Sequence, residues 1–508
     1  MKQYLLAHDL GTSGNKATLF SLEGKLIKSE TSAYETYYSN GNWAEQDSED
    51  WWSAVCSSTK KLLLGIDPKD IASVCFSGQM MGCLPVDKQG KPLHRHLLYC
   101  DQRSVEQENI LLEKVGMEEV YRITGHRASA SYGITKLRWL KDHHPEIFNQ
   151  TWKMLNAKDY LNFRLTGRMV TDYNDASGTN AFDITRLEWS ARILDAMGIP
   201  ESMMPEAVPS TTVIGEIIGE ASRATGLAVG TPVVAGAGDG GCATVGAGCV
   251  KPGRAYNYLG SSSWIATTSL KPVHDPAMQT FTWVHPVPGY LQPCGTMQTA
   301  GSSYDWMIRE LARGESMQAE TENKNIHLLL EDLMSQSSAG SKGVLFLPYM
   351  LGERSPRWNP DAKGSFLNLN LEIKRADMFR SVLEGVTMNL DIILKIFQKE
   401  LPIENLLVIG GGAKGRFWNQ LMADIFGIPV HIPINLEEAT SMGAAIIGGV
   451  GCGALSGFDV VDRFIEMDRV LEPNSANRGV YDSSRILFEK AYWAVEPLFN
   501  DFNSLKAT

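Results

Sequence analysis

The chain has 508 residues, of which 44% are hydrophobic and 21% charged, and its formal net charge is −11. A chain of this length exceeds a single hydrophobic core, so we expect two large lobes. The negative charge and the lack of a basic cluster argue against nucleic acid or a membrane surface as the main partner, and the eight scattered cysteines, none in a C-x-x-C pair, argue against a zinc ribbon. With no apolar run of membrane-spanning length and no signal peptide, we expect a cytoplasmic enzyme, and a homodimer is compatible with these totals.

Strand-like and helical stretches alternate through the first third of the chain, at 4–7, 17–21, 50–64, 72–76 and 103–115. This alternation favours an α/β fold. Glycine and proline clusters follow in the middle, and we place the passage between the lobes there, which divides the chain into 1–247 and 248–508. A last helix is predicted over 484–499, packing back on the first lobe.

The first strand leads into a short turn of Gly11, Thr12, Ser13 and Gly14. Taken alone, such a turn indicates only a hairpin. However, LGTSGNKAT at 10–18 recurs as LGSSSWIAT at 259–267, with five of nine positions identical. Chance similarity of turn residues is one explanation, and a doubled scaffold with the same turn in each half is the other.

Two such turns facing each other across a cleft would direct backbone N–H groups at a phosphate from both sides. No G-x-x-x-x-G-K-[ST] loop is available for that task. We therefore predict that nucleotide phosphates are bound by residues of both turns: Gly11, Thr12, Ser13, Gly260, Ser261 and Ser262.

Two glycine loops, GAGDGG at 236–241 and GGGAKG at 410–415, match G-x-G-x-x-G and favour a rival interpretation, a nicotinamide-dependent oxidoreductase. That motif needs an acidic residue about 20 positions further on to bind the ribose. After the first loop none appears before Asp275, whereas the second is followed by Glu437 and Glu438.

If the hairpins hold phosphates, the second glycine loop becomes the floor of an adenosine site, to which we assign Gly411, Gly412 and Asn419. The segment EEATSMGAA at 437–445 would form the other wall. Its alternative role is close helix packing through Gly443 and the alanines after it.

Two aspartates end predicted strands. Asp239 lies between glycines after a short buried strand, where it is either a helix N-cap or a carboxylate that accepts a proton from an attacking hydroxyl. Asp9 ends the first strand beside the first turn. A carboxylate there would serve magnesium bound to a nucleotide, usually through water.

These segments together resemble the FGGY carbohydrate kinases, and within that family most closely the xylulokinases. The resemblance spans nearly the whole chain, and each segment is weak alone but specific in this order. In chain order they read DLGTSGNKA, WAEQD, GQMMG, CDQRS, AKDYLNFRLTG, TDYNDASGT, GAGDGG, LGSSSW, LPYMLGERSPRWNPDAKG, RSVLEGV and GGGAKGRFWNQLMADIFG.

The resemblance implies two ribonuclease-H-like, actin-like lobes with the active site in the cleft between them. It implies transfer of the γ-phosphoryl group of Mg-ATP to a sugar hydroxyl, with Asp239 as the catalytic base and Asp9 beside the metal and phosphates. GQMMG and WAEQD match segments of the sugar pocket, with CDQRS nearby. The predicted sugar-binding residues are therefore Trp43, Gln79, Met80, Met81, Asp101 and Asp239.

Three departures from the family pattern bear on the substrate. Met81 stands where xylulokinases usually carry His, Gly240 where Asn is frequent, and Tyr99–Cys100 where Trp and Asn are common. Lost polar groups change which sugar hydroxyls a pocket can bind, although Met80 and Met81 are also explained by core packing.

D-Xylulose is the leading substrate by resemblance, and another ketose, a polyol or gluconate is the alternative. Outside this class we keep the oxidoreductase and a non-catalytic, actin-like nucleotide binder.

Overall fold

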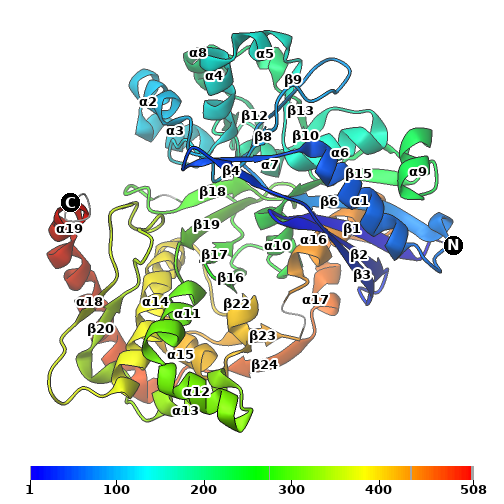
Figure 1. Ribbon diagram of the computed structural model, residues 1–508. Helices are drawn as coiled ribbons and strands as arrows, with labels where there is room; N and C mark the ends of the chain where they lie inside the picture. Colours follow the sequence, from blue (N-terminus) through cyan, green and yellow to red (C-terminus); the bar gives the residue numbers. More distant parts are fainter. Residues whose placement is uncertain (1, 274, 435–436, 505–508) are drawn as a thin grey trace.

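The computed structural model describes residues 2–273, 275–434 and 437–504. The first lobe is built on a six-stranded sheet with the order β14-β15-β6-β1-β2-β3 (Figure 1). β1, β2 and β3 form an antiparallel meander, and β6 and β15 run parallel to β1. The strands are β1 (Tyr4–Leu10), β2 (Gly14–Ser21), β3 (Leu26–Ala33), β6 (Ile71–Gly78), β14 (Val213–Glu216) and β15 (Pro232–Gly238).

The second lobe repeats this plan in a seven-stranded sheet with the order β18-β19-β17-β16-β22-β23-β24. Here β16, β17 and β19 are antiparallel, and β22 and β23 continue parallel to β16. The strands are β16 (Ala255–Leu259), β17 (Ser263–Thr267), β18 (Phe281–Val284), β19 (Leu291–Met297), β22 (Leu406–Ile409), β23 (Val430–Pro433) and β24 (Met467–Leu471).

Five strands are common to the two sheets, in the order β3-β2-β1-β6-β15 in the first and β19-β17-β16-β22-β23 in the second. Numbered along the chain, these five have the order 3-2-1-4-5 with the second strand antiparallel, which is the ribonuclease-H-like arrangement. The two copies of the repeated sequence lie at the first hairpin of each sheet, so the doubled-scaffold interpretation and the two-lobed α/β fold are confirmed. The second glycine loop follows β22 in this sheet, which has antiparallel strands where a dinucleotide-binding fold is parallel. The dinucleotide-binding interpretation is therefore wrong.

Helices cover both faces of the sheets. In the first half they are α1 (Ser48–Leu62), α2 (Val105–Lys114), α3 (Met117–Thr124), α4 (Gly133–His143), α5 (Pro145–Gln150), α6 (Ala157–Thr166), α7 (Tyr173–Ser177), α8 (Ala191–Met197), α9 (Gly219–Thr225) and α10 (Asp239–Gly246). In the second half they are α11 (Gly301–Leu311), α12 (Arg313–Glu322), α13 (Ile326–Ser335), α14 (Arg375–Gln398), α15 (Arg416–Phe426), α16 (Ala439–Gly451), α17 (Val461–Phe464), α18 (Arg478–Val495) and α19 (Phe499–Ser504). The predicted helices over 50–64 and 103–115 correspond to α1 and α2.

Two helices cross where the lobes meet, and each contacts the sheet of the other lobe. α10 follows β15, and its Ala243 and the C-cap residue Ala247 share an apolar cluster with residues of β16 and β22. α16 follows β23, yet it packs under β1, β6 and β15 of the first sheet (Figure 1). A division at 247/248 thus separates the two sheets, although α16, which follows the division in sequence, packs on the first sheet.

The crossing is close enough to require glycine in both helices. A Cβ atom on Gly443 would overlap the carbonyl oxygen of Cys242, and one on Gly246 would overlap that of Ala439. The expected close packing through Gly443 is therefore confirmed, and its partner is α10.

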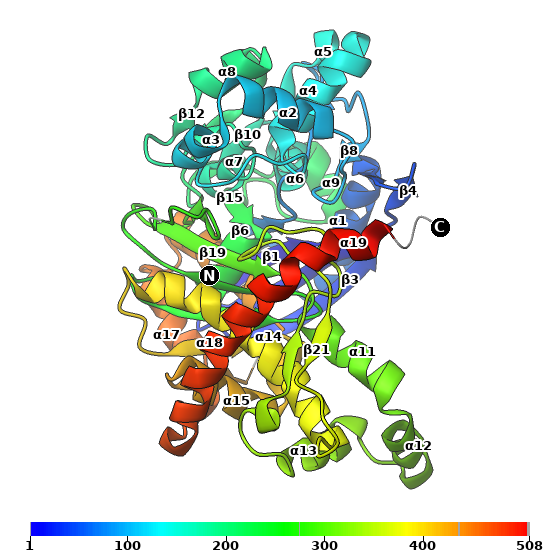
Figure 2. The same cartoon turned by 90° about the vertical axis from the view of Figure 1, so that its left-hand side faces the viewer.

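The last long helix begins earlier than predicted, at Arg478, and ends at Val495. It lies against the second lobe beside α14 (Figure 2). Its buried Tyr481, Phe488 and Tyr492 belong to the same core as α14 and α15. For this helix the expected packing on the first lobe is wrong, because its apolar face completes the core of its own half.

Among the described residues, no helix combines the length and apolar character that crossing a bilayer requires.

Candidate active site

The carboxyl ends of three strands meet at one edge of the first sheet. The register pairs Leu10 of β1 with Gly78 of β6, and Gly78 with Gly238 of β15. Asp9 and Asp239 therefore lie about two strand spacings apart, roughly 10 Å. Loops that follow such strand ends are where α/β folds place their ligands.

Asp239 is the first residue of α10, and Gly238 takes the N-cap position. Its Oδ1 accepts a hydrogen bond of 2.7 Å from the Gly240 N–H, and the residue is exposed. The surrounding protein partly desolvates this carboxyl, and this desolvation, followed by the nearby charge of Asp9, raises its pKa to about 6. At neutral pH Asp239 is therefore an accessible carboxylate that can accept a proton.

Asp9 lies deeper in the same edge. Its Oδ1 accepts a hydrogen bond of 3.0 Å from Ser77 Oγ, and burial raises its pKa. Lys16, whose charge acts in the opposite sense, pairs at 2.5 Å with Glu438 just before α16. Among the described residues no group of three or more His, Cys, Asp or Glu could enclose a metal. A single carboxylate can be enough for magnesium that is also bound by substrate phosphates, because this ion keeps several waters.

Both turns direct their carbonyl groups into their own lobe. In the first turn the carbonyl of Gly11 accepts a hydrogen bond from Tyr34 Oη, and that of Thr12 from Gln46 Nε2 at 2.6 Å. Because a trans peptide points its C=O and N–H in opposite directions, the amide groups that follow these carbonyls face the other way. The first turn thus presents donors suited to an anion.

In the second turn the carbonyl of Gly260 accepts from Gly301 N at 2.9 Å, and that of Ser261 from Ala300 N at 2.9 Å. These donors belong to the start of α11. The second turn is thereby held in the same manner as the first.

A chain of amides connects the predicted sugar segment to the first turn. Gln79 Nε2 donates to Gln46 Oε1 at 2.6 Å, and Gln46 Nε2 donates to the Thr12 carbonyl. Gln46 belongs to the segment WAEQD but was not among the predicted site residues. It is a polar residue at a buried position of β5 (Trp43–Gln46), and a polar residue within a predicted strand was the available signal.

Met80 and Met81 are buried, each with 7% exposure, in an apolar cluster that includes Tyr132 and Trp283. Met81 has a positive φ of 69°, unusual for a residue other than glycine. A Cβ atom on Gly238 would overlap Met80. Met80 therefore packs directly beneath the residue that precedes Asp239.

Trp43 and Asp101 are brought together by Arg103. The Arg103 guanidinium lies 3.8 Å from the centre of the Trp43 ring, and its Nη2 lies 2.7 Å from Asp101 Oδ2. Asp101 Oδ2 also accepts from the Ala44 N–H at 2.7 Å. These contacts assign Asp101 to shaping the loop beside the site, and they cover one face of Trp43.

The second glycine loop lies beside the second turn. A Cβ atom on Gly412 would overlap the side chain of Leu259, whereas the space around Gly411 is open. Asn419 is fully buried, and its Nδ2 donates to the Ala413 carbonyl at 2.7 Å. Gly411 therefore presents an open surface, while Asn419 braces the loop from behind.

Two aromatic residues that sequence reasoning did not assign lie on this side of the cleft. The rings of Tyr258 and Trp264 stack with centroids 4.1 Å apart. Burial raises the pKa of Tyr258, and the charges of Asp9, Glu437 and Asp239 add to the effect. Trp264 stands in the repeat at the position of Asn15 in the first copy, and this difference was the available signal.

Comparison with known proteins agrees with this architecture. Models of the FGGY family of carbohydrate kinases match the chain at residues 4–246 (N-terminal domain) and 255–452 (C-terminal domain). The chain is 31% identical over 507 residues to the xylulose kinase of Staphylococcus epidermidis, covering 99% of both chains. It is 30% identical to the gluconokinase of Bacillus licheniformis, covering 98% of this chain and 97% of that protein.

Among solved structures, the xylulose kinase of Lactobacillus acidophilus superimposes with a TM-score of 0.91 at 26% identity, covering 98% of this chain and 99% of that one. The matches to the family extend over both ribonuclease-H-like lobes and the edge that holds Asp9 and Asp239. The chain therefore belongs to the FGGY family of carbohydrate kinases.

Proposed function

We propose that the protein transfers the γ-phosphoryl group of ATP to the primary hydroxyl of a ketopentose, and that this sugar is D-xylulose, giving D-xylulose 5-phosphate. The observation that carries the proposal is Asp239, an exposed carboxylate with a pKa of about 6 at the end of β15, beside the segment with Gln79 and Met80. A carboxylate of this kind can accept the hydroxyl proton while the oxygen attacks phosphorus.

The rest of the site has supporting roles. The turns at 11–14 and 260–263 bind the phosphates through backbone amides, and Gly411 and Gly412 contact the adenosine. Asp9 would hold magnesium through water, and the ion, when bound, neutralises charge on the phosphates. The hydrogen-bonded amides of Gln79 and Gln46 tie the sugar segment to the first turn, so that both substrates are positioned against one rigid edge.

Two observations favour a neutral sugar. Two cations beside the site are neutralised within the protein, since Arg103 pairs with Asp101 and with Glu45, and Lys16 pairs with Glu438. Met80 and Met81 lie in an apolar cluster with Tyr132 and Trp283. Several full-length relatives are xylulose kinases, from S. epidermidis, Bacillus subtilis and Escherichia coli.

One observation favours gluconate as the second candidate. His126 borders the apolar cluster, with its Nδ1 3.0 Å from Tyr132 Oη. Burial, and then the nearby charge of Arg354, lower the pKa of His126 to about 3. The Arg354 guanidinium lies 6.0 Å from the ring centre of Trp358. A cation there offers a partner for the carboxylate of a sugar acid.

The test is a coupled assay of ADP release with Mg-ATP and a panel of ketopentoses, ketohexoses, polyols and sugar acids. We expect kcat/KM for D-xylulose to exceed that for D-gluconate by at least about tenfold, the lower end of what pocket contacts achieve. A higher kcat/KM for D-gluconate than for D-xylulose would make gluconate the assigned substrate, provided that Arg354→Gln abolishes this preference and retains turnover of D-xylulose. No turnover of either would overturn both assignments.

The pH dependence provides a separate prediction. Asp239 accepts a proton only when ionised, so kcat/KM is expected to be constant above its pKa and to fall about tenfold per pH unit below about pH 6. The measurement is kcat/KM between about pH 5 and 8 at saturating Mg-ATP. A profile that stays nearly flat down to about pH 5, as the ordinary aspartate pKa of about 4 would give, would contradict the environment described for Asp239.

A further inference from the structure

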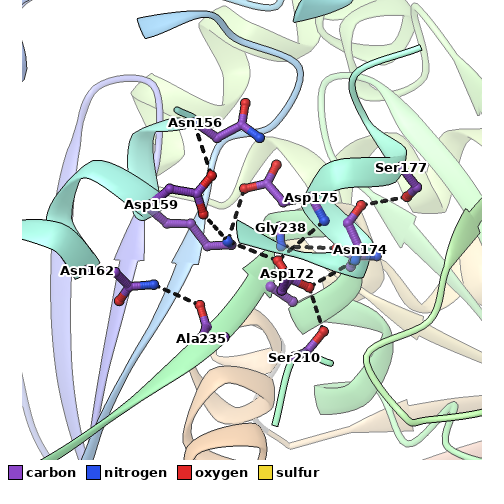
Figure 3. Close-up of polar contacts among 12 residues, drawn as sticks. Asn156, Asp159, Asn162, Asp172, Asn174, Asp175, Ser177, Ser210, Ala235 and Gly238 are labelled. Atoms are coloured by element: carbon purple, nitrogen blue, oxygen red, sulfur yellow. Dashed lines mark hydrogen bonds and ion pairs between the residues drawn. The ribbon is translucent and has the colours of Figure 1, made fainter. Parts of the chain in front are cut away.

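A buried polar cluster lies behind the active edge, and the reaction as described leaves it without a role (Figure 3). Lys158 Nζ is 2.6 Å from Asp159, 2.9 Å from Asp172 and 3.3 Å from Asp175. The four side chains have no solvent exposure. Burying one cation with three carboxylates is costly compared with an apolar core, which suggests that the cluster has a use besides stability.

The cluster holds the beginnings of two helices together. Asp159 accepts a hydrogen bond of 3.1 Å from the Asn156 N–H and so closes the capping box of α6. Asp172 caps α7, accepting from the Asn174 N–H at 2.9 Å, and Ser210 Oγ donates to it at 2.5 Å. Because Lys158 contacts both carboxylates, it fixes α7 relative to α6.

Asn174, in the first turn of α7, extends from this cluster to the active site. Its Oδ1 accepts a hydrogen bond of 3.0 Å from the N–H of Gly238, the residue before Asp239. A Cβ atom on Gly241 would overlap the same Asn174 amide, so the side chain also packs against the first turn of α10. Asn174 therefore contacts the chain on both sides of Asp239.

The same side chain reaches the second lobe. Asn174 Nδ2 donates to the carbonyl oxygen of Val284 in β18 at 2.6 Å. Ser177, at the end of α7, accepts from the Val284 N–H at 3.2 Å. Through these bonds α7 connects the beginning of α10 with the sheet that carries the second turn.

The sugar segment rests on the same support. A Cβ atom on Gly78 would lie 2.8 Å from Lys158 Cβ. Gly78 directly precedes Gln79, so α6 lies immediately behind the end of β6.

We propose that Asn174, held by Asp172 and Lys158, is a positioning residue that fixes the Asp239 carboxylate relative to the second lobe for phosphoryl transfer. The inference rests on the proposed function of Asp239. Asn174 acts through the backbone of Gly238 and not on the substrates. A small displacement of a reacting group is enough to cost about 10²-fold in rate.

The test is a double-mutant cycle of Asn174→Ala and Asp239→Asn, with kcat measured at saturating sugar and Mg-ATP and active sites counted by ADP titration. In the wild-type background Asn174→Ala is expected to lower kcat about 10- to 100-fold with the number of ADP sites unchanged. In the Asp239→Asn background it should have little further effect, because the group that it positions is no longer a base. Equal losses in both backgrounds would overturn the proposal.

Asn162→Ala is the matched control. Asn162 is also fully buried, and its Nδ2 donates at 2.9 Å to the Ala235 carbonyl of the same strand, β15 (Figure 3). Loss of this hydrogen bond should lower thermal stability but have the same small effect on kcat in both backgrounds.

Gly241→Ala keeps the test decisive if Asn174→Ala does not fold. Its Cβ displaces the Asn174 amide while leaving the residue in place, so we expect the same loss of kcat and the same dependence on Asp239. A wild-type kcat for Gly241→Ala would count against the proposal. If Asp239→Asn itself had wild-type activity, the proposed base would be wrong, an outcome distinguishable from failure of the Asn174 contact alone.

Discussion

Asp239→Asn is expected to lower kcat by about 10²- to 10⁴-fold, the contribution of a positioned general base. The substitution keeps the size of the side chain but removes the charge that accepts the proton. The Gly240 N–H can still bond to the amide oxygen, so the start of α10 should be preserved. Nucleotide binding, which the two turns and the second glycine loop provide in our proposal, should be largely unchanged. The measurements are kcat with the preferred sugar and the dissociation constant of Mg-ADP by calorimetry.

Glu220→Gln is the control for this substitution. Glu220 is an exposed acidic residue in the first turn of α9, in the same lobe but away from the strand ends. Neutralising it should leave kcat and ADP binding as in the wild type. The role of Asp239 fails if its Asn variant turns over sugar at the wild-type rate.

Gly443→Leu is expected to reduce the free energy of unfolding by about 3 kcal/mol or more, beyond the usual range for overpacking a core. A Cβ atom at this position already overlaps the Cys242 carbonyl, and the obstacle is helix backbone, which cannot move aside as a flexible side chain does. α16 must then separate from α10, and with it the contact that joins the lobes. We expect a lower midpoint in urea unfolding and a lower kcat, since the proposed base, Asp239, is the first residue of α10.

Two further variants define the cause. Gly246→Ala places its Cβ against the Ala439 carbonyl at the same crossing and should act in the same direction. Gly479→Ala is the matched control, because this glycine lies in helix α18 with open space around the new Cβ. It should raise stability slightly, by up to about 1 kcal/mol, through helix propensity. Equal effects of Gly443→Leu and Gly479→Ala would show that the helix crossing is not close.

Local features of the sequence were sufficient for the strands and turns that hold the candidate site residues. The strand-like stretches predicted at 4–7, 17–21 and 72–76 lie within β1, β2 and β6, and both copies of the repeated turn lie at equivalent hairpins. Such elements are readable because a strand, its turn and the next strand lie within about twenty residues, so that local pattern and local structure coincide.

The contacts that decide the site connect distant parts of the chain. Asn174 bonds to Gly238, 64 positions away, and to Val284, 110 positions away, and neither partner has a local signal. The packing of α18 could not be predicted for a similar reason. The sequence of an amphipathic helix shows that the helix has an apolar face, but not which surface covers that face.

The sequence by itself determined the doubled α/β plan, the two repeated turns and the family, since these depend on short motifs and their order. Only the tertiary structure decided that α10 and α16 cross through Gly246 and Gly443, and that Gln46 connects the predicted sugar segment to the first turn. It alone also placed the buried polar cluster around Lys158 behind Asp239. The physical reason is that these features arise from side chains and helices meeting across two sheets, where the spacing along the chain carries no record of the distance in space.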